Sequence, residues 1–348
     1  MKPLNNMDVE EFLDLEEIDL NLPVKNLQVV RQTEKNRSKG FDRRGKVKTV
    51  AAAPVQKQAD VEFTYHPSRH EEQWLNGSLA EFFEQKWFDD ILSMVRGGKE
   101  ASVYLCKSSA TVKNGLVAAK VYRPRMFRNL RKDHLYREGR DPLDIDGKII
   151  LDDRSLHAMQ QRTGYGKELM HSSWIGHEFK TMEVLYDAGV EIPKPHTSGS
   201  NVILMEYIGD ELAAAPTLNT VTLESTEARE LYQRVVHNIE LMLQCNRIHA
   251  DLSAFNILYW DGGITLIDFP QAINPDQNQN AYRIFSRDIT RVCEYFSSQG
   301  VKTDPTGLTR TLWKEKGRLI NPVIDPRFLD PEKEEDMQVW KKQKIHQE

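Results

Sequence analysis

The sequence predicts an α+β fold of two lobes, in which an antiparallel sheet with one helix precedes a mainly helical lobe. Strand-like runs gather in residues 94–123, whereas amphipathic helical patterns dominate residues 174–299. A chain of 348 residues with 39% hydrophobic side chains can form one two-lobed catalytic domain with tails, or two ordinary domains.

We expect the folded domain to cover residues 65–300, with a first lobe over about 65–205 and a second over about 206–300. A C-terminal extension, residues 301–348, follows it. The segment before the domain, residues 1–64, is expected to be a charged and disordered tail, because it holds opposite charge blocks and few large apolar side chains.

The charges of this tail allow two interpretations. Residues 8–19 carry seven acids, and residues 25–48 carry nine bases. One interpretation is a solvated segment that neutralises itself. The other is a basic arm for RNA, which the acidic block can mask.

The whole composition indicates a protein of the cytoplasm. No run of about 18 apolar residues is present, so no membrane span or membrane partner is expected. The acidic N-terminus lacks the order of a secretory signal. Cys106, Cys245 and Cys293 are far apart and odd in number, which predicts neither a disulfide framework nor a metal-binding pair. The net charge of −5 does not by itself indicate nucleic-acid binding.

The first lobe is expected to begin with a helix. Ser78 and Glu81 have the spacing of a capping box, and Leu79, Phe82, Phe83 and Phe88 form an apolar stripe after it. Residues 94–106 and 115–123 then predict a strand hairpin.

Residues 123–170 show no clean period, and residues 123–140 contain seven bases. Such a long segment inside a domain is usually functional or disordered. The basic part is either an RNA-phosphate contact or a solvated loop.

The remaining elements alternate mainly between helix and hairpin patterns. A helix is predicted over residues 174–190, ended by Gly189, and a strand over 202–209. The later predictions are a helix over 226–247, a hairpin over 256–269 and a helix over 281–299.

Phosphoryl transfer from ATP needs a backbone loop over the phosphates, a lysine on their oxygens, a carboxylate that holds the lysine, and ligands for a metal ion. The sequence offers candidates in the chain order that protein kinases use. Gly98 lies in a glycine turn before a strand, Lys120 lies inside the next strand, and Glu178 lies one turn into a helix. Alone, each has an ordinary explanation as a turn, a solvent-facing lysine or an exposed helix carboxylate.

The stronger indication is the set HADLSAFNIL and LIDFPQ. Asp251 is the candidate base or hydroxyl-orienting group, and Asn256 offers a neutral oxygen to Mg²⁺. Asp268 ends an apolar strand, where a metal ion would compensate for its desolvation. Each residue alone could be a helix cap or a turn residue. The three in order, after Lys120 and Glu178, indicate an ATP and Mg²⁺ site.

These segments resemble the RIO kinases, a family of atypical protein kinases. The resemblance covers about residues 90–300 and includes GGKEASVY, WIGHEFKTMEVLYDAGV followed by IPKP, MEYIG, AAAPTL, HADLSAFNIL and LIDFPQ. It implies a compact two-lobed protein-kinase-like fold that uses ATP with Mg²⁺ or Mn²⁺. The predicted helix over residues 174–190 corresponds to the family's helix C. The resemblance also implies residue roles: Asp251 and Asp268 are catalytic, and Asn256 and Asp268 hold metal. The nucleotide contacts that it implies are Gly98, Lys99, Ser102, Val103, Lys120, Glu178, Met205, Glu206 and Ile208, with Met205 as gatekeeper.

Two departures from the family pattern leave the subfamily open. Ala250 stands where the family usually has glycine. LIDFPQ resembles one subfamily, whereas the long insert that separates Lys120 from Glu178, 58 positions later, resembles another.

Three functions remain open on the sequence. The first is a serine/threonine protein kinase that acts on a partner or on itself. The second is an ATP-driven switch in maturation of the small ribosomal subunit, which the resemblance implies, with ribosomal RNA meeting residues 25–48 and 123–140 and Asp268 as a possible phosphate acceptor. The third is a small-molecule kinase of the aminoglycoside or choline type, which shares the HxDxxxxN loop. A pseudokinase is disfavoured, because every candidate ATP-contacting position is filled.

Overall fold

The computed structural model describes residues 63–98, 100–109, 112, 115–123, 140–144, 147–199, 201–317 and 337. Lys99, the tail up to residue 62, and nearly all of the C-terminal stretch after residue 317 therefore lie outside the described residues. So does the basic segment, except for Arg123 and Arg140 at its ends.

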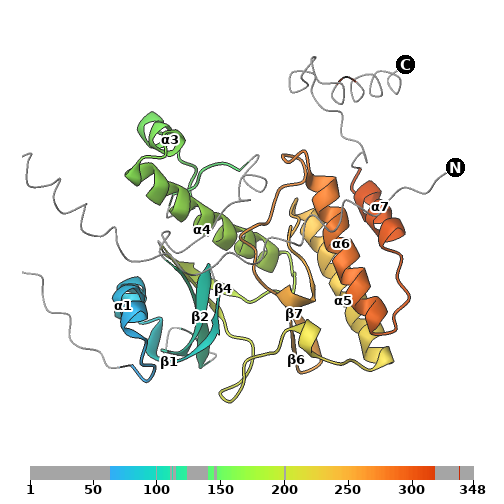
Figure 1. The fold of residues 1–348 in the computed structure, drawn as a ribbon, viewed down its shortest axis with the longest axis horizontal. Helices are drawn as coiled ribbons and strands as arrows, with labels where there is room; N and C mark the ends of the chain where they lie inside the picture. Colours follow the sequence, from blue (N-terminus) through green and yellow to red (C-terminus); the bar gives the residue numbers. More distant parts are fainter. Residues whose placement is uncertain are drawn as a thin grey trace, which may run out of the picture. The chain divides into compact units, whose positions relative to one another are not determined.

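The first part of the fold is an antiparallel sheet with helices on both sides (Figure 1). The elements in chain order are α1 (Arg69–Glu84), β1 (Phe88–Gly97), β2 (Ala101–Ser108), β3 (Leu116–Tyr122), α3 (Asp153–Gln160), α4 (Gly164–Asp187), β4 (Pro195–Ser198) and β5 (Val202–Glu206). The strands lie in the order β1-β2-β3-β5-β4. The predicted hairpin is β2 with β3, whereas β1 reaches back to Phe88, beyond the expected start of strand structure.

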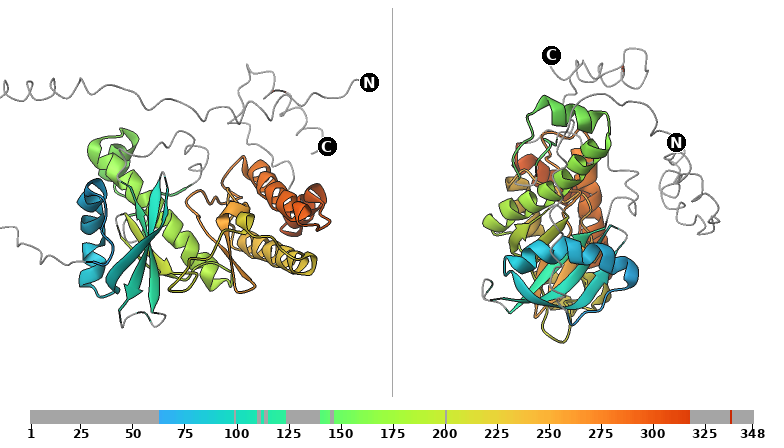
Figure 2. Two further views of the ribbon diagram at one scale, coloured as in Figure 1. Left: turned by 60° about the horizontal axis from the view of Figure 1, so that its bottom comes forward. Right: turned by 90° about the vertical axis from the view of Figure 1, so that its left-hand side faces the viewer.

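The sheet is covered on both faces, which explains the run of apolar residues in β3. Val117, Ala119 and Val121 point to one face and pack in a cluster with Leu75 and Leu79 of α1. Successive side chains of a strand alternate, so Lys120 and Tyr122 point to the other face, where Tyr122 packs with residues of α4. Figure 2 shows α1 and α4 on opposite sides of the sheet.

The predicted start of α1 at Ser78 is wrong. The helix begins after Ser68, where the carboxylate of Glu71 accepts a hydrogen bond from the Ser68 amide at 3.3 Å and completes the capping box. Ser78 lies inside the helix, and its hydroxyl donates to the carbonyl of Trp74 at 2.6 Å. The two serine–glutamate pairs have the same spacing, so the local pattern alone does not distinguish them.

Helix α4 is longer than the sequence predicts. It begins at Gly164 instead of residue 174, so the second half of the charged insert is helical and adds α3 as a partner. A Cβ atom at Gly166 would lie 1.8 Å from the carbonyl oxygen of Ala158, so only glycine lets α4 approach the end of α3 this closely. Gly189 has φ +82° just after the helix, as predicted for a left-handed helix end.

The second part of the fold is mainly helical, as predicted. Its elements are η3 (Leu218–Thr220), α5 (Ser225–Gln244), η4 (Ala254–Asn256), β6 (Ile257–Trp260), β7 (Gly263–Leu266), α6 (Ala281–Ser298) and α7 (Pro305–Glu315). The core continues past residue 300, since the indole of Trp313 in α7 packs on Tyr282 and Phe285 of α6 with ring centres 5.2 and 5.6 Å apart. None of the helices in the described part of the chain combines the length and apolar character needed to cross a membrane.

Candidate active site

A cleft of about 750 Å³ lies between the sheet and the second part of the fold. Val103 of β2 and Ala118 of β3 line it from the sheet, and Leu258 and Ile267 line it from the β6–β7 hairpin. Of the residues predicted to form the site, those that line the cleft are Gly98, Val103, Lys120, Glu178, Met205, Glu206, Ile208, Asn256 and Asp268.

Lys120 connects three separate elements at the centre of the cleft. Its Nζ atom lies 2.7 Å from Oε1 of Glu178 in α4 and 2.6 Å from Oδ1 of Asp268, which follows β7. The side chains of Lys120 and Glu178 are 11% and 1% exposed, whereas that of Asp268 is 45% exposed. Lys120 is therefore held by a buried carboxylate behind it and a carboxylate that faces the open cleft.

The three groups have different proton affinities. Burial opposes the charge on Lys120, but Asp268 and Glu178 outweigh it, so the pKa of Lys120 lies above its usual value. Burial also raises the pKa of Glu178 despite the nearby ammonium. Partial burial also opposes the charge on Asp268, but the charge and the hydrogen bond of Lys120 together outweigh this effect and lower the pKa of Asp268. Lys120 and Asp268 are thus held as an ion pair at neutral pH.

Two predicted phosphate-loop residues are not placed at the cleft. Ser102 is 1% exposed within β2, opposite Val121 of β3, and is not among the residues that line the cleft. Since side chains alternate along a strand, the exposure of Val103 to the cleft turns Ser102 toward the other face. Lys99 lies outside the described residues, and Arg96 and Glu100 beside it line the cleft.

The loop after α5 positions Asp251 and Asn256. The amide of Asn256 donates from Nδ2 to the carbonyl of Asp251 at 2.9 Å and to its Oδ2 atom at 3.2 Å. His249 is buried, donates from Nε2 to the carbonyl of Ile267 at 3.0 Å, and packs on the ring of Phe269 with centres 4.8 Å apart. His249 therefore ties this loop to the segment that carries Asp268.

Backbone geometry in these two segments is unusual. Ala250 and Asp268 both have positive φ, at +66° and +72°. Aspartate enters this region more readily than other residues that carry a Cβ atom, whereas alanine has no side-chain hydrogen bond to compensate. Ala250 is therefore strained at this position, whereas the glycine that the family usually has there would adopt the conformation without strain.

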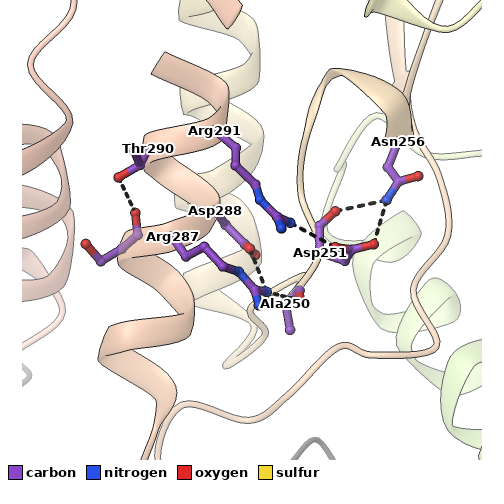
Figure 3. A network of polar contacts seen from close by, with 8 residues as sticks. Ala250, Asp251, Asn256, Arg287, Asp288, Thr290 and Arg291 are labelled. Atoms are coloured by element: carbon purple, nitrogen blue, oxygen red, sulfur yellow. Dashed lines mark hydrogen bonds and ion pairs between the residues drawn. The ribbon is translucent and has the colours of Figure 1, made fainter. Parts of the chain in front are cut away.

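Two arginines of α6 form hydrogen bonds with the loop that carries Asp251, and they were not identified from the sequence. Arg291 donates from Nη1 to Oδ1 of Asp251 at 2.9 Å, and Arg287 donates to the carbonyl of Ala250 (Figure 3). Arg287 also lies 3.2 Å from Oδ1 of the buried Asp288. Their four-residue spacing on a predicted helix was the available signal, but nothing local linked them to residues 40 positions earlier.

The strand edge at Met205–Ile208 presents backbone groups to the cleft. The amide of Tyr122 donates to the carbonyl of Asn201, so these two opposed residues form a hydrogen-bonded pair. Hydrogen-bonded and non-hydrogen-bonded pairs alternate along an antiparallel ladder. The pair Val117–Glu206, five residues further along, is therefore not hydrogen-bonded. The amide of Glu206 donates to Lys194 at 2.8 Å, and the carbonyl of Ile208 accepts from Ala215 at 3.0 Å. Among the described residues, the Glu206 carbonyl and the Ile208 amide remain for a ligand.

Oxygen donors for a cation are also present. The Nδ2 group of Asn256 is directed at Asp251, which leaves its Oδ1 atom, and the carboxylate of Asp268 is partly exposed in the same cleft. One amide oxygen and one carboxylate are the type of ligand set that Mg²⁺ shares with phosphate oxygens and water.

Comparison with known proteins identifies relatives of this chain. A family model described as "RIO domain" matches residues 151–307. The chain is 30% identical over 142 residues to the RIO-type serine/threonine-protein kinase Rio1 of Thermoplasma acidophilum, covering 41% of this chain and 73% of that protein. It is 28% identical over 222 residues to Rio1 of Haloferax volcanii, covering 63% and 68%.

A human relative, serine/threonine-protein kinase RIO1, is 29% identical over 219 residues, covering 61% of this chain and 34% of the relative. The chain thus spans about a third of the length of this relative and of its counterpart in Caenorhabditis elegans.

Proposed function

Because the chain belongs to the RIO family of atypical serine/threonine protein kinases, we propose that it transfers the γ-phosphate of ATP to a serine or threonine hydroxyl of a protein, either a partner or itself. The observation that carries the proposal is the position of Lys120. Its ammonium is charged, anchored by a buried carboxylate, and lies beside Asp268 in a cleft large enough for a nucleotide.

Each part of the cleft has a role in this proposal. The adenine lies between apolar side chains of the sheet and of the hairpin, Val103 and Ala118 above and Leu258 below, and exchanges hydrogen bonds with the free backbone groups of Glu206 and Ile208. Lys120 binds phosphate oxygens, and Glu178 keeps its ammonium in place. Asn256 and Asp268 would hold Mg²⁺, or Mn²⁺ in its place, which would supply positive charge against the phosphates.

Asp251 receives the incoming hydroxyl in this proposal. A base of this kind must come within hydrogen-bond reach of the proton that it accepts. Its two carboxylate oxygens are each engaged, Oδ1 by Arg291 and Oδ2 by Asn256. Each oxygen has a second lone pair, so the incoming hydroxyl either joins these contacts or replaces one of them.

A second candidate function is an ATP-driven switch, in which Asp268 accepts the phosphate and water then removes it. The observation that favours it is that Asp268 lines the cleft with a side chain that is 45% exposed, whereas Asp251 is not among the residues that line it. Maturation of the small ribosomal subunit is the role that the resemblance suggests for this switch. Residues 25–48 and nearly all of residues 123–140, the proposed contacts with ribosomal RNA, lie outside the described residues.

One incubation with Mg²⁺ and γ-labelled ATP separates the two functions. Label on protein that survives acid and mild base would support a serine or threonine kinase, and the Asp251→Ala variant should then lose it. Free phosphate with base-labile label, absent in Asp268→Ala, would support the switch instead. A wild-type protein that neither labels itself or a general protein substrate nor releases phosphate would contradict both.

A further inference from the structure

Helix α6 carries an arginine-lined groove beside the loop of Asp251. Arg283, Arg287 and Arg291 occur at four-residue spacing and therefore share one face of the helix. They line a cavity of about 530 Å³ together with Thr290 and Glu294, which we call the arginine groove. Three guanidinium groups against the single carboxylate of Glu294 give the lining of the groove a net positive charge.

The groove connects directly to the proposed base. Arg291 is 40% exposed and spans from the groove to Oδ1 of Asp251 (Figure 3). Arg283, in contrast, is exposed and has neither an ion pair nor a hydrogen bond among the described residues. Arg291 therefore binds Asp251, whereas Arg283, two turns away on the same helix, is available to a ligand.

We propose that the arginine groove is the acceptor subsite, and that it selects protein segments with acidic side chains beside the serine or threonine to be phosphorylated. This inference rests on the proposed kinase function and names its substrate class. A substrate carboxylate takes Arg291 away from Asp251, which frees Oδ1 for the hydroxyl. A second carboxylate binds Arg283. An acidic substrate thus makes Asp251 available as the base that accepts the proton of its own hydroxyl.

The length of the groove sets the spacing of the two acids. Arg283 and Arg291 are eight residues apart, which is roughly 12 Å along a helix at about 1.5 Å per residue. An extended peptide advances about 3.3 Å per residue, so this distance corresponds to roughly four residues. We expect one acid next to the acceptor hydroxyl and another about four residues further along.

The lining favours a protein segment over RNA. Binding of single-stranded RNA uses exposed aromatic rings on which bases stack. The aromatic side chain of the groove, Tyr282, is partly buried, with its ring packed edge-on against Trp313 at 5.2 Å. Glu294 and Asp251 would also repel a continuous phosphate backbone, whereas a peptide with two spaced acids avoids them.

The test compares peptides of equal length that carry one serine. One set has a glutamate beside the serine and a second glutamate four residues beyond the first, on the N-terminal side of the serine in one peptide and on the C-terminal side in another. The matched set has glutamines at these positions. Wild-type protein is measured beside Arg283→Gln, Arg291→Gln and Arg291→Lys, with Arg229→Gln as the control for loss of an exposed arginine on α5.

We expect the wild type to have a lower KM for one glutamate peptide than for its glutamine counterpart. Arg283→Gln should raise that KM about three- to fivefold, the size of a partly exposed ion pair, and leave the glutamine peptide unchanged. Arg291→Gln should weaken the preference, which Arg283 then carries alone, and raise kcat on the glutamine peptide, because Asp251 is released. Arg291→Lys should keep more of the preference than Arg291→Gln does, and Arg229→Gln should keep all of it.

Equal KM values for the glutamate and glutamine peptides in the wild type would overturn the proposal, and so would an equal effect of Arg283→Gln on both. Inhibition by an oligouridylate that is weaker in Arg283→Gln would assign the groove to RNA and also overturn it.

If no peptide is phosphorylated by any form, the kinase function fails, and fluorescence anisotropy with labelled peptides still tests the groove. Tighter binding of the glutamate peptide that Arg283→Gln weakens would support acidic-segment binding, and equal binding would exclude it.

Discussion

Lys120 and Asp268 are separated by 148 residues in the chain, yet the ammonium of one lies 2.6 Å from a carboxylate oxygen of the other. The same ammonium contacts Glu178 in α4 at 2.7 Å. One side chain thus joins β3, α4 and the segment after β7. The two carboxylates differ in exposure, since Glu178 is buried and Asp268 faces the cleft.

Replacing Lys120 tests this arrangement through stability. Lys120→Ala leaves the buried Glu178 without its cation, and breaking a buried ion pair from one side costs about 3–5 kcal/mol. Because Glu178 already has a raised pKa, it can take up a proton at low pH, so the loss should be greater at pH 8 than at pH 5. Urea unfolding at both pH values measures it.

Two further variants control this comparison. Lys302→Ala removes an exposed lysine and should change little. Adding Glu178→Gln to Lys120→Ala should recover part of the stability. Equal unfolding free energies for Lys120→Ala and the wild type would show that the pair is not held as described.

Replacing Asp251 should separate chemistry from nucleotide binding. Asp251 contacts Asn256 and Arg291 but is not among the residues that line the cleft. Asp251→Ala should lower kcat by roughly 10²- to 10⁴-fold, the usual contribution of general base catalysis, with the Kd for ATP nearly unchanged. Single-turnover kinetics and equilibrium ATP binding give the two quantities. Asp153→Ala, an exposed aspartate of α3, is the control, and a variant with undiminished turnover would remove Asp251 from the mechanism.

Ala250 should tolerate glycine better than other buried alanines do. Its φ of +66° costs an L-residue roughly 1–2 kcal/mol, which offsets the entropy that glycine loses on folding. Ala250→Gly should therefore leave the unfolding midpoint unchanged or raise it. Ala228→Gly, at a buried position of α5, should lower stability by about 1 kcal/mol. A similar loss in both variants would count against strain at position 250.

Gly166 and Gly164 offer a matched pair at the start of α4. Added at Gly166, a Cβ atom would overlap the backbone of Ala158, whereas at Gly164 it would meet nothing within 4 Å. Gly166→Ala should destabilise by about 1–3 kcal/mol or separate α3 from α4. Gly164→Ala should be neutral or slightly stabilising. Thermal unfolding, with amide exchange on α3, distinguishes the two, and equal behaviour would contradict the close approach of these helices.

His177 should make stability depend on pH below neutrality. Burial lowers its pKa below the usual 6.5, although its ring contacts the carbonyl of Asp141. The unfolded chain therefore binds a proton near pH 6.5 while the folded chain does not, so stability falls as pH drops through this region. His177→Gln should flatten that dependence between pH 7 and 5. His157→Gln, exposed on α3, should retain it.

The sequence predicted the parts of the fold that depend on local or repeated patterns. The hairpin of β6 and β7, the helices α5 and α6, and the left-handed end at Gly189 follow from periodicity and turn chemistry. Lys120 and Glu178 were paired correctly from motif order, although a lysine in a strand is usually solvent-facing. In the folded chain both faces of the sheet are covered, so Lys120 is buried although it lies in a strand.

The parts that sequence did not predict depend on contacts between distant segments. Ser68 and Ser78 offer the same capping pattern, and only packing decides where α1 begins. Position 102 was assigned to the phosphate loop by motif, but the register of β2 turns Ser102 away from the cleft. Arg287 and Arg291 contact the loop of Asp251, which lies some 40 residues earlier in the chain, so no local pattern indicates their role.

Helix α4 is unbroken from Gly164 to Asp187, and Glu178 lies 14 residues from its start, roughly 21 Å along the axis. Its first turn is locked against α3, outside the sheet. Because α4 is continuous between these two points, we expect a displacement of α3 to be transmitted along the helix to Glu178, the carboxylate that holds Lys120.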